Sequence, residues 1–167
     1  GSATMTGGHI SATGEKELEG YYNRIKGTWG GPPIVRTFFV VQLDQAFSQF
    51  EQWSNGYDDT SGYVVYDNVK PGGVIKMKVG LSFTSIDNAR LNLSTECNHW
   101  DFDRVAKESR DVWNQYLGRI DVQGGTRQQR TKFYTDLWHA LTGRKKLNDV
   151  NGAIPDYTDG KGNNTKT

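Results

Sequence analysis

Residues 74–84 read VIKMKVGLSFT, and residues 85–93 continue as SIDNARLNL. In the first stretch Met77, Val79 and Leu81 share one parity, while the lysines fall on the other. Alternation with a period of two is typical of a β-strand with one buried face. The second stretch opens on a serine that can cap a short helix, and the alternation stops there. The chain is therefore predicted to change from strands to helices near residue 84.

Upstream of this point, three further runs have the composition of strands. Residues 20–29, 34–43 and 62–67 are rich in β-branched and aromatic side chains. Glycine- and proline-rich turns separate them, at residues 30–33 and 68–73. Several short strands divided by such turns favour an antiparallel sandwich. We therefore expect residues 1–84 to be a portion of a β-sandwich domain.

Downstream, two longer helices are predicted. Asp101 can cap a helix that extends to residue 117, and Thr126 with Gln129 fits the capping box of the next one. Both helices have wide apolar stripes that must be buried against something. On the second helix the stripe consists of the side chains Phe133, Tyr134, Leu137 and Trp138. The last eight residues, 160–167, have no apolar side chain and predict a flexible tail.

Composition excludes several classes of function. The 167 residues include 20 basic and 19 acidic side chains, so the formal net charge is only +1. Nucleic acid and anionic membrane surfaces are poor partners for such a balance. No run of about 18 apolar residues occurs, so no membrane span is predicted. The single cysteine, Cys97, has no partner for a disulfide and no metal-ligand companion.

The chain carries no recognisable catalytic constellation. Its three histidines do not cluster, and motifs for a nucleophilic serine, a zinc protease or a phosphate-binding loop are absent from the sequence. The loop from Asp149 to Gly152, followed by Asp156 and Asp159, lacks the carboxylate spacing of a calcium loop. We therefore predict no catalytic and no metal-binding residue in this chain.

Two tryptophans beside turns are candidates for sugar binding. Trp29 precedes Gly30, and Trp53 precedes a Ser-Asn-Gly turn. Aromatic rings in such places can stack on sugar rings, although packing within the domain explains them as well. Composition and spacing alone indicate a β-rich domain followed by a helical segment, without a defined activity.

An ordered series of motifs adds a family to this interpretation. Residues 79–93, VGLSFTSIDNARLNL, resemble the segment that ends the N-terminal β-sandwich of glycoside hydrolase family 92. The similarity continues through Asp101-Phe102-Asp103 and the helix that follows. It extends over Ile120–Thr126, Gln129, Phe133–Thr135, His139–Leu141 and the Asp149-Val-Asn-Gly152 turn.

The resemblance implies a two-domain parent protein. In family 92, a β-sandwich is joined by helices to an (α/α)6 barrel. Residues 85–125 then correspond to linker helices with a short strand, and residues 126–167 to the start of the helical catalytic domain. Family 92 enzymes are Ca²⁺-dependent exo-α-mannosidases that invert configuration. Their acid, base and calcium ligands lie in the barrel, which is expected beyond this chain.

The resemblance also implies a biological setting. The expected partners are mannose-containing glycans and the downstream barrel, and the expected location is secreted, periplasmic or at the cell surface. The chain itself is then a non-catalytic part of the enzyme, inactive alone. Two alternatives stay open: a free-standing carbohydrate-binding sandwich without hydrolase activity, and a structural domain that only packs against a partner.

Overall fold

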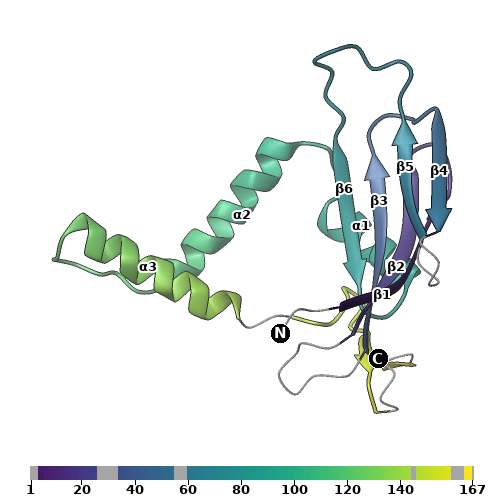
Figure 1. Cartoon of the computed structure of the whole chain (residues 1–167). Coiled ribbons are helices and arrows are strands. Elements are labelled where there is room, and N and C mark those ends of the chain that lie inside the picture. The colour runs from purple at the N-terminus through teal and green to yellow at the C-terminus, as the bar shows by residue number, and fades with distance from the viewer. Residues whose placement is uncertain (1–3, 26–33, 55–59, 144–145, 159–163, 167) are drawn as a thin grey trace. The chain divides into compact units, whose positions relative to one another are not determined.

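A computed structural model describes residues 4–25, 34–54, 60–143, 146–158 and 164–166. It divides into two compact units: Gly1–Trp100 with Leu147–Thr167, and Asp101–Lys146. The first unit contains all the described strands and one helix, and the second contains two helices (Figure 1). The β-rich class with helices after the main strands, predicted from the sequence, is confirmed. The predicted boundaries at residues 84 and 125 remain predictions about the parent protein.

An antiparallel four-stranded sheet forms the centre of the first unit. Its order is β1-β2-β3-β6. The strands are β1 (Thr4–Ala12), β2 (Glu17–Ile25), β3 (Ile34–Leu43) and β6 (Met77–Ser82). Two smaller antiparallel pairs accompany it: β4 (Gln49–Ser54) with β5 (Thr60–Val65), and β7 (Ile154–Asp156) with β8 (Asn164–Lys166). The predicted strands at 34–43, 62–67 and 74–84 correspond to β3, β5 and β6.

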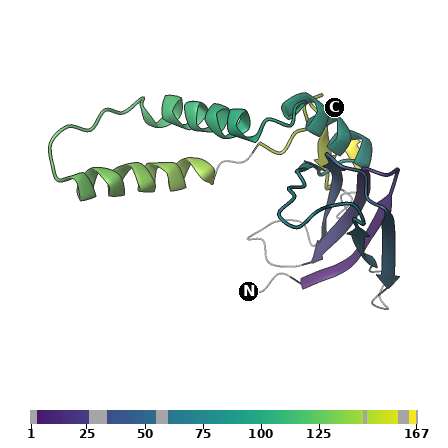
Figure 2. The same cartoon turned by 90° about the horizontal axis from the view of Figure 1, so that it is seen from above.

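Helix α1 (Ile86–Glu96) covers one face of this sheet (Figures 1 and 2). The Ser85 hydroxyl caps it by accepting from the Asn88 backbone N–H at 3.0 Å, as predicted. A small core forms beneath the helix from Val40, Ala89 and Leu93, which are 0%, 0% and 3% exposed.

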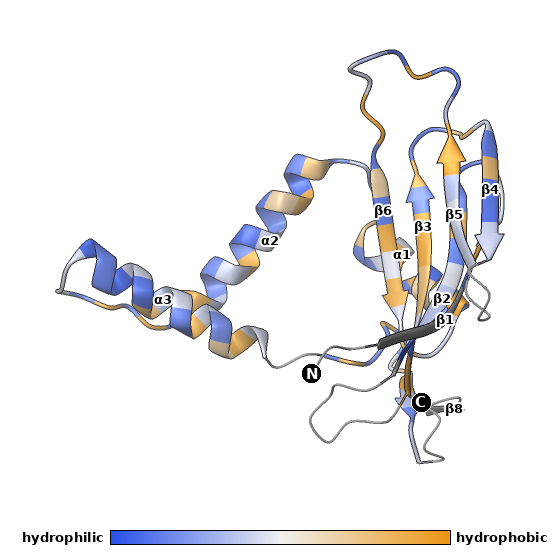
Figure 3. Cartoon of the chain, in the orientation of Figure 1, coloured by the Kyte–Doolittle hydropathy of each residue, from blue (hydrophilic) through white to orange (hydrophobic). Residues whose placement is uncertain are grey.

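The predicted buried face of β6 is wrong. Met77, Val79 and Leu81 are about half exposed or more, whereas Gly80 and Ser82 are buried. The reason is that α1 packs on the parity of Gly80, which pairs with Val40. A Cβ at Gly80 would lie 2.3 Å from the Ala89 carbonyl oxygen, so glycine permits this close approach. The apolar residues of β6 are the orange segments of this strand in Figure 3.

The second unit is a helical hairpin of α2 (Phe102–Leu117) and α3 (Arg127–Thr142) (Figure 2). Asp101 caps α2, and Thr126 with Gln129 forms the predicted capping box of α3. Trp113 and Trp138 meet edge to face, with ring centroids 6.0 Å apart. Neither helix contains a buried residue, so both apolar stripes remain partly exposed.

Candidate functional site

Three stretches of the family-like motif series meet around one buried carboxylate. Asp149 is 4% exposed, and its Oδ1 accepts from the Asn92 amide at 2.7 Å. Its Oδ2 accepts from the hydroxyls of Ser82, at 3.0 Å, and Thr84. Ser82 and Asn92 are themselves buried. The carboxylate therefore ties the end of β6, the helix α1 and the 147–153 loop together in one network.

The loop that carries this aspartate is shaped around it. The Asn92 Oδ1 accepts from the Val150 backbone N–H at 2.9 Å, so the amide contacts the loop through both ends. Gly152 has a φ of +88°, a conformation that favours glycine, and its N–H donates to the Asp149 carbonyl at 2.9 Å. The Asp149-Val-Asn-Gly152 motif is thus a turn held against α1.

This network is structural in its chemistry. The Asp149 oxygens already accept hydrogen bonds from two hydroxyls and an amide, all neutral donors. A general base has to accept a proton from a substrate or a water molecule, and a calcium ligand has to direct a lone pair at the ion. The hydrogen-bonded arrangement satisfies Asp149 internally, which suits a buried polar joint.

A second cluster of charge links α1 to β2. The Arg90 guanidinium donates to the Glu17 carboxylate at 2.9 Å and also to Glu19. Burial acts to raise the pKa of Glu17, but hydrogen bonds from Gln42 and Arg90 outweigh it and hold that pKa below its ordinary value. A glycosidase general acid needs the opposite, a raised pKa. This carboxylate is therefore suited to binding, not to proton donation.

The two tryptophans singled out from the sequence differ in what can be said of them. Trp29 lies outside the described residues. Trp53 lies on β4, is 48% exposed, and tilts against Tyr63 of β5 at a centroid distance of 6.1 Å. The Tyr63 hydroxyl donates to Glu51, and this hydrogen bond raises the pKa of the tyrosine. Trp53 thus stands in an exposed aromatic pair with a carboxylate beside it.

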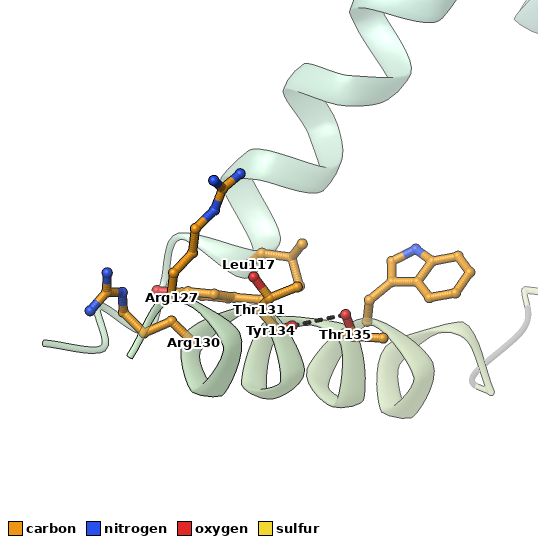
Figure 4. A pocket seen from close by; sticks show the side chains of 7 residues that line it. Leu117, Arg127, Arg130, Thr131, Tyr134 and Thr135 are labelled. Carbon is orange, nitrogen blue, oxygen red and sulfur yellow. Dashed lines mark hydrogen bonds between the residues drawn. The ribbon is translucent and has the colours of Figure 1, made fainter. Parts of the chain in front are cut away.

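A groove of about 490 Å³ runs along the helical hairpin (Figure 4). Leu117 at the end of α2 lies over α3 in this view. Arg130 is anchored by its donation to the carbonyls of Gly124 and Gly125, at 2.9 and 2.8 Å. The lining residues, which include no carboxylate, are Leu117, Arg127, Arg130, Thr131, Tyr134, Thr135 and Trp138. The groove lacks the paired carboxylates that glycoside hydrolysis requires.

No group of three or more metal-ligating side chains exists among the residues that the structure describes. Asp156, which follows the Asp149 loop, accepts from the Thr158 backbone N–H at 2.9 Å, and Asp159 lies outside the described residues. Among the same described residues, no helix has the length and apolar character of a membrane span.

Sequence reasoning missed the buried role of Asp149 and the ion pairs of Arg90. Both depend on partners 57 to 73 positions away in the chain. The available signal was the motif series itself, because Ser82, Asn92 and Asp149 all belong to it. Their shared polarity beside apolar neighbours was compatible with a buried network.

Comparison with known proteins bears on the origin of these motifs. Residues 88–167 match the model of the glycosyl hydrolase family 92 catalytic domain. No curated protein sequence matches the chain significantly.

Solved structures resemble almost the whole chain. The family GH92 α-mannosidase BT3965 from Bacteroides thetaiotaomicron has a TM-score of 0.79 at 16% identity, over 99% of this chain and 23% of that one. The family GH92 inverting mannosidase BT2199 from the same organism has a TM-score of 0.72 at 22% identity, over 92% and 22%. The gh92 family glycosyl hydrolase ccman5 has a TM-score of 0.72 at 21% identity, over 92% and 21%. At these identities the likeness shows a shared fold, and the chain spans less than a quarter of each structure.

Proposed function

We propose that this chain, whose residues 88–167 match the model of the glycosyl hydrolase family 92 catalytic domain, forms the sandwich and linker part of an exo-α-mannosidase. The parent enzyme releases terminal α-linked mannose from glycans with inversion. In this proposal the chain itself is non-catalytic, and the acid and base carboxylates lie in a downstream (α/α)6 barrel.

One observation carries the proposal. The family match covers residues 88–167, while the likeness to the α-mannosidase BT3965 extends over 99% of the chain but only 23% of that structure. Most of such an enzyme would therefore lie outside this chain. The motif residues within the chain join elements to one another: Ser82 and Asn92 bind the loop through Asp149, and Arg90 binds β2. Hydrogen bonds and ion pairs that link elements of the fold in this way support a structural role for the chain.

The described residues do not fit the expected Ca²⁺. Calcium takes six to eight oxygen ligands. The buried Asp149 is instead surrounded by hydroxyl and amide donors, and Glu17 and Glu19 are paired with Arg90. We therefore propose that the calcium site of the parent enzyme lies outside the described part of this chain.

Inverting hydrolysis sets a geometric requirement for the parent. An acid and a base about 6.5–9.5 Å apart leave room for the attacking water. Glu17, whose pKa is held low, cannot supply the acid. The chain would instead contribute structural support to the catalytic domain. A secreted, periplasmic or cell-surface location is part of the same proposal, since glycans are found there.

The test uses the full-length protein that contains this segment, expressed beside the 167-residue chain. We expect the full-length protein to hydrolyse aryl α-mannosides and to lose activity in EGTA. The first product, followed by NMR, should be β-mannose. The 167-residue chain should be inactive under all conditions. Hydrolysis by this chain alone, or an inactive full-length protein, would refute the proposal.

The exposed pair of Trp53 and Tyr63 favours a second candidate function, a carbohydrate-binding module without hydrolase activity. It predicts that the chain binds mannosides and that Trp53→Ala abolishes binding, measured by isothermal titration calorimetry. Unchanged binding in this variant would exclude Trp53 as the binding residue.

A further inference from the structure

At one end of the four-stranded sheet, a small cavity combines an indole with polar side chains. Its volume is about 270 Å³. Glu17 begins β2 and Lys16 precedes it, while Gln42 and Leu43 end β3. The full lining is Lys16, Glu17, Gln42, Leu43, Asp44 and Trp100, all within the first unit.

The aromatic wall of this cavity is fixed in place. The Lys78 ammonium lies 4.2 Å from the centroid of the Trp100 ring, as a cation–π contact. Lys76 Nζ donates to the Trp100 carbonyl at 3.0 Å, and Lys78 Nζ donates to the Cys97 carbonyl at 3.0 Å. Two lysines from β6 and its approach therefore hold the half-buried indole at the rim, so little side-chain entropy would be lost on binding.

The polar wall is equally well ordered. Gln42 Nε2 donates to Glu17 at 2.9 Å, and the Asp44 carboxylate accepts from the Lys76 backbone N–H at 2.9 Å. The Lys16 ammonium donates to the Asp44 carbonyl at 3.1 Å. Because hydrogen bonds keep the pKa of Glu17 low, its carboxylate stays ionised as an acceptor near neutral pH.

The chemistry of these walls selects a class of ligand. Carboxylate and amide oxygens accept from hydroxyl groups, the ammonium donates, and Leu43 with the indole offers apolar contact. An anion would meet two carboxylates, and a calcium ion would need more oxygen ligands than the cavity offers. A volume somewhat below the roughly 300–1,000 Å³ of drug-sized sites matches one small polyhydroxylated ring.

We propose that this cavity binds a single neutral sugar residue, with Trp100 as the apolar contact and Asp44 as the hydroxyl acceptor. Only the choice of a mannoside as probe rests on the proposed function.

The test is an NMR titration of the ¹⁵N-labelled 167-residue chain with methyl α-D-mannopyranoside. We expect saturating shifts at the Trp100 indole N–H and the Gln42 side-chain amide, with a Kd of order 1 mM, which corresponds to about −4 kcal/mol. Trp100→Ala, followed through Gln42, should raise the Kd at least about tenfold. Asp44→Asn retains Oδ1 as an acceptor and should weaken binding severalfold without unfolding the chain.

Leu81→Ala is the matched control, because it removes a side chain that is 53% exposed on β6 and does not line the cavity. Its Kd should equal that of the unmodified chain. The proposal is overturned if no saturating shift appears up to about 50 mM sugar, a concentration that would nearly fill a millimolar site. It is also overturned if Leu81→Ala abolishes the shifts or if Asp44→Asn leaves them unchanged. Activity of the parent enzyme plays no part in this test, so the two proposals can fail separately.

Discussion

Replacing Asp149 by alanine should destabilise the first unit strongly, and much more than the replacement of an exposed carboxylate. The substitution removes the acceptor for the Ser82 and Thr84 hydroxyls and for the Asn92 amide. The donors that lose this acceptor are buried, because Ser82 and Asn92 are 3% and 8% exposed. Asn92 Nδ2 keeps its bond to the Leu81 carbonyl at 2.8 Å, and the Ser82 hydroxyl keeps its contact with the Thr84 hydroxyl at 3.0 Å. The loop that carries Asp149 also loses one of its attachments to α1, while the bonds of Val150 and Asn151 to that helix remain.

The magnitude follows from the number of bonds. Hydrogen bonds to a charged group contribute about 1.5 kcal/mol each at the lower end, so three give roughly 4.5 kcal/mol. The cost of burying the carboxylate is recovered in the variant, and water can enter the space, which lowers the net loss. We expect a decrease of about 3 kcal/mol in the free energy of unfolding. Asp149→Asn should cost about half as much, since it retains one oxygen acceptor.

Urea unfolding, followed by the NMR amide signals of β3 and α1, measures this unit alone. Asp87→Asn is the control: its carboxylate is 96% exposed and pairs with Arg90 at 3.3 Å. Such a surface pair contributes little, so its effect should be within about 0.5 kcal/mol. If Asp149→Ala changes the free energy of unfolding by less than about 1 kcal/mol, the buried network does not hold the loop and the reasoning is refuted.

Three further predictions concern other parts of the chain. The pKa of Glu17 is lowered from its ordinary value of 4.5. Its interactions therefore stabilise the fold above pH 4.5 and are lost as the pH falls through the lower folded-state pKa; urea midpoints between pH 6 and pH 3 should decline less steeply in Glu17→Gln. Gly80→Ala should lower the free energy of unfolding by about 1–3 kcal/mol, because the new methyl would lie 2.3 Å from the Ala89 carbonyl oxygen. Tyr134→Phe removes the hydroxyl that accepts from the Val122 N–H at 3.2 Å, and hydrogen exchange at Val122 should accelerate by about fivefold to tenfold, equivalent to about 1 kcal/mol.

Each of these has an outcome that contradicts it. If the urea midpoints of the unmodified chain and of Glu17→Gln fall in parallel as the pH is lowered, the interactions of Glu17 do not contribute to the loss of stability in acid. An unchanged urea midpoint in Gly80→Ala would mean that α1 can move away from the sheet at no cost. Unaltered exchange at Val122, with the neighbouring amides as the internal reference, would show that the tyrosine hydroxyl does not hold the connection before α3.

Local signals predicted the element types well. The caps at Ser85 and Asp101 and the box of Thr126 with Gln129 depend on atoms within three residues of one another, and all three are present. Strands β3 and β5 were also predicted from the residue types within their own segments. Strands β1 and β4 escaped prediction because polar and glycine residues interrupt them; β1 even contains a register shift between Met5 and Gly8. Pairing with a neighbouring strand, not composition, makes these segments extended.

The candidate sites were less predictable. Trp53 was identified from its place beside a turn, but its partner Tyr63 follows from the pairing of β4 with β5. The Trp100 cavity joins residues from the start of β2, the end of β3 and the segment after α1. No spacing rule brings these side chains together, because strand order and register decide which ends of the sheet meet.

The sequence by itself determined where strands give way to helices, how the helices begin, and which family motifs the chain carries. These properties arise from interactions among residues a few positions apart. The tertiary structure was needed to show that β6 buries Gly80 and not the apolar side chains of Met77, Val79 and Leu81. It was also needed to show that Asp149 is buried and links β6, α1 and the 147–153 loop by hydrogen bonds. Both outcomes depend on α1 packing against a particular face of the sheet, and burial is a property of the partner surface that no local pattern contains.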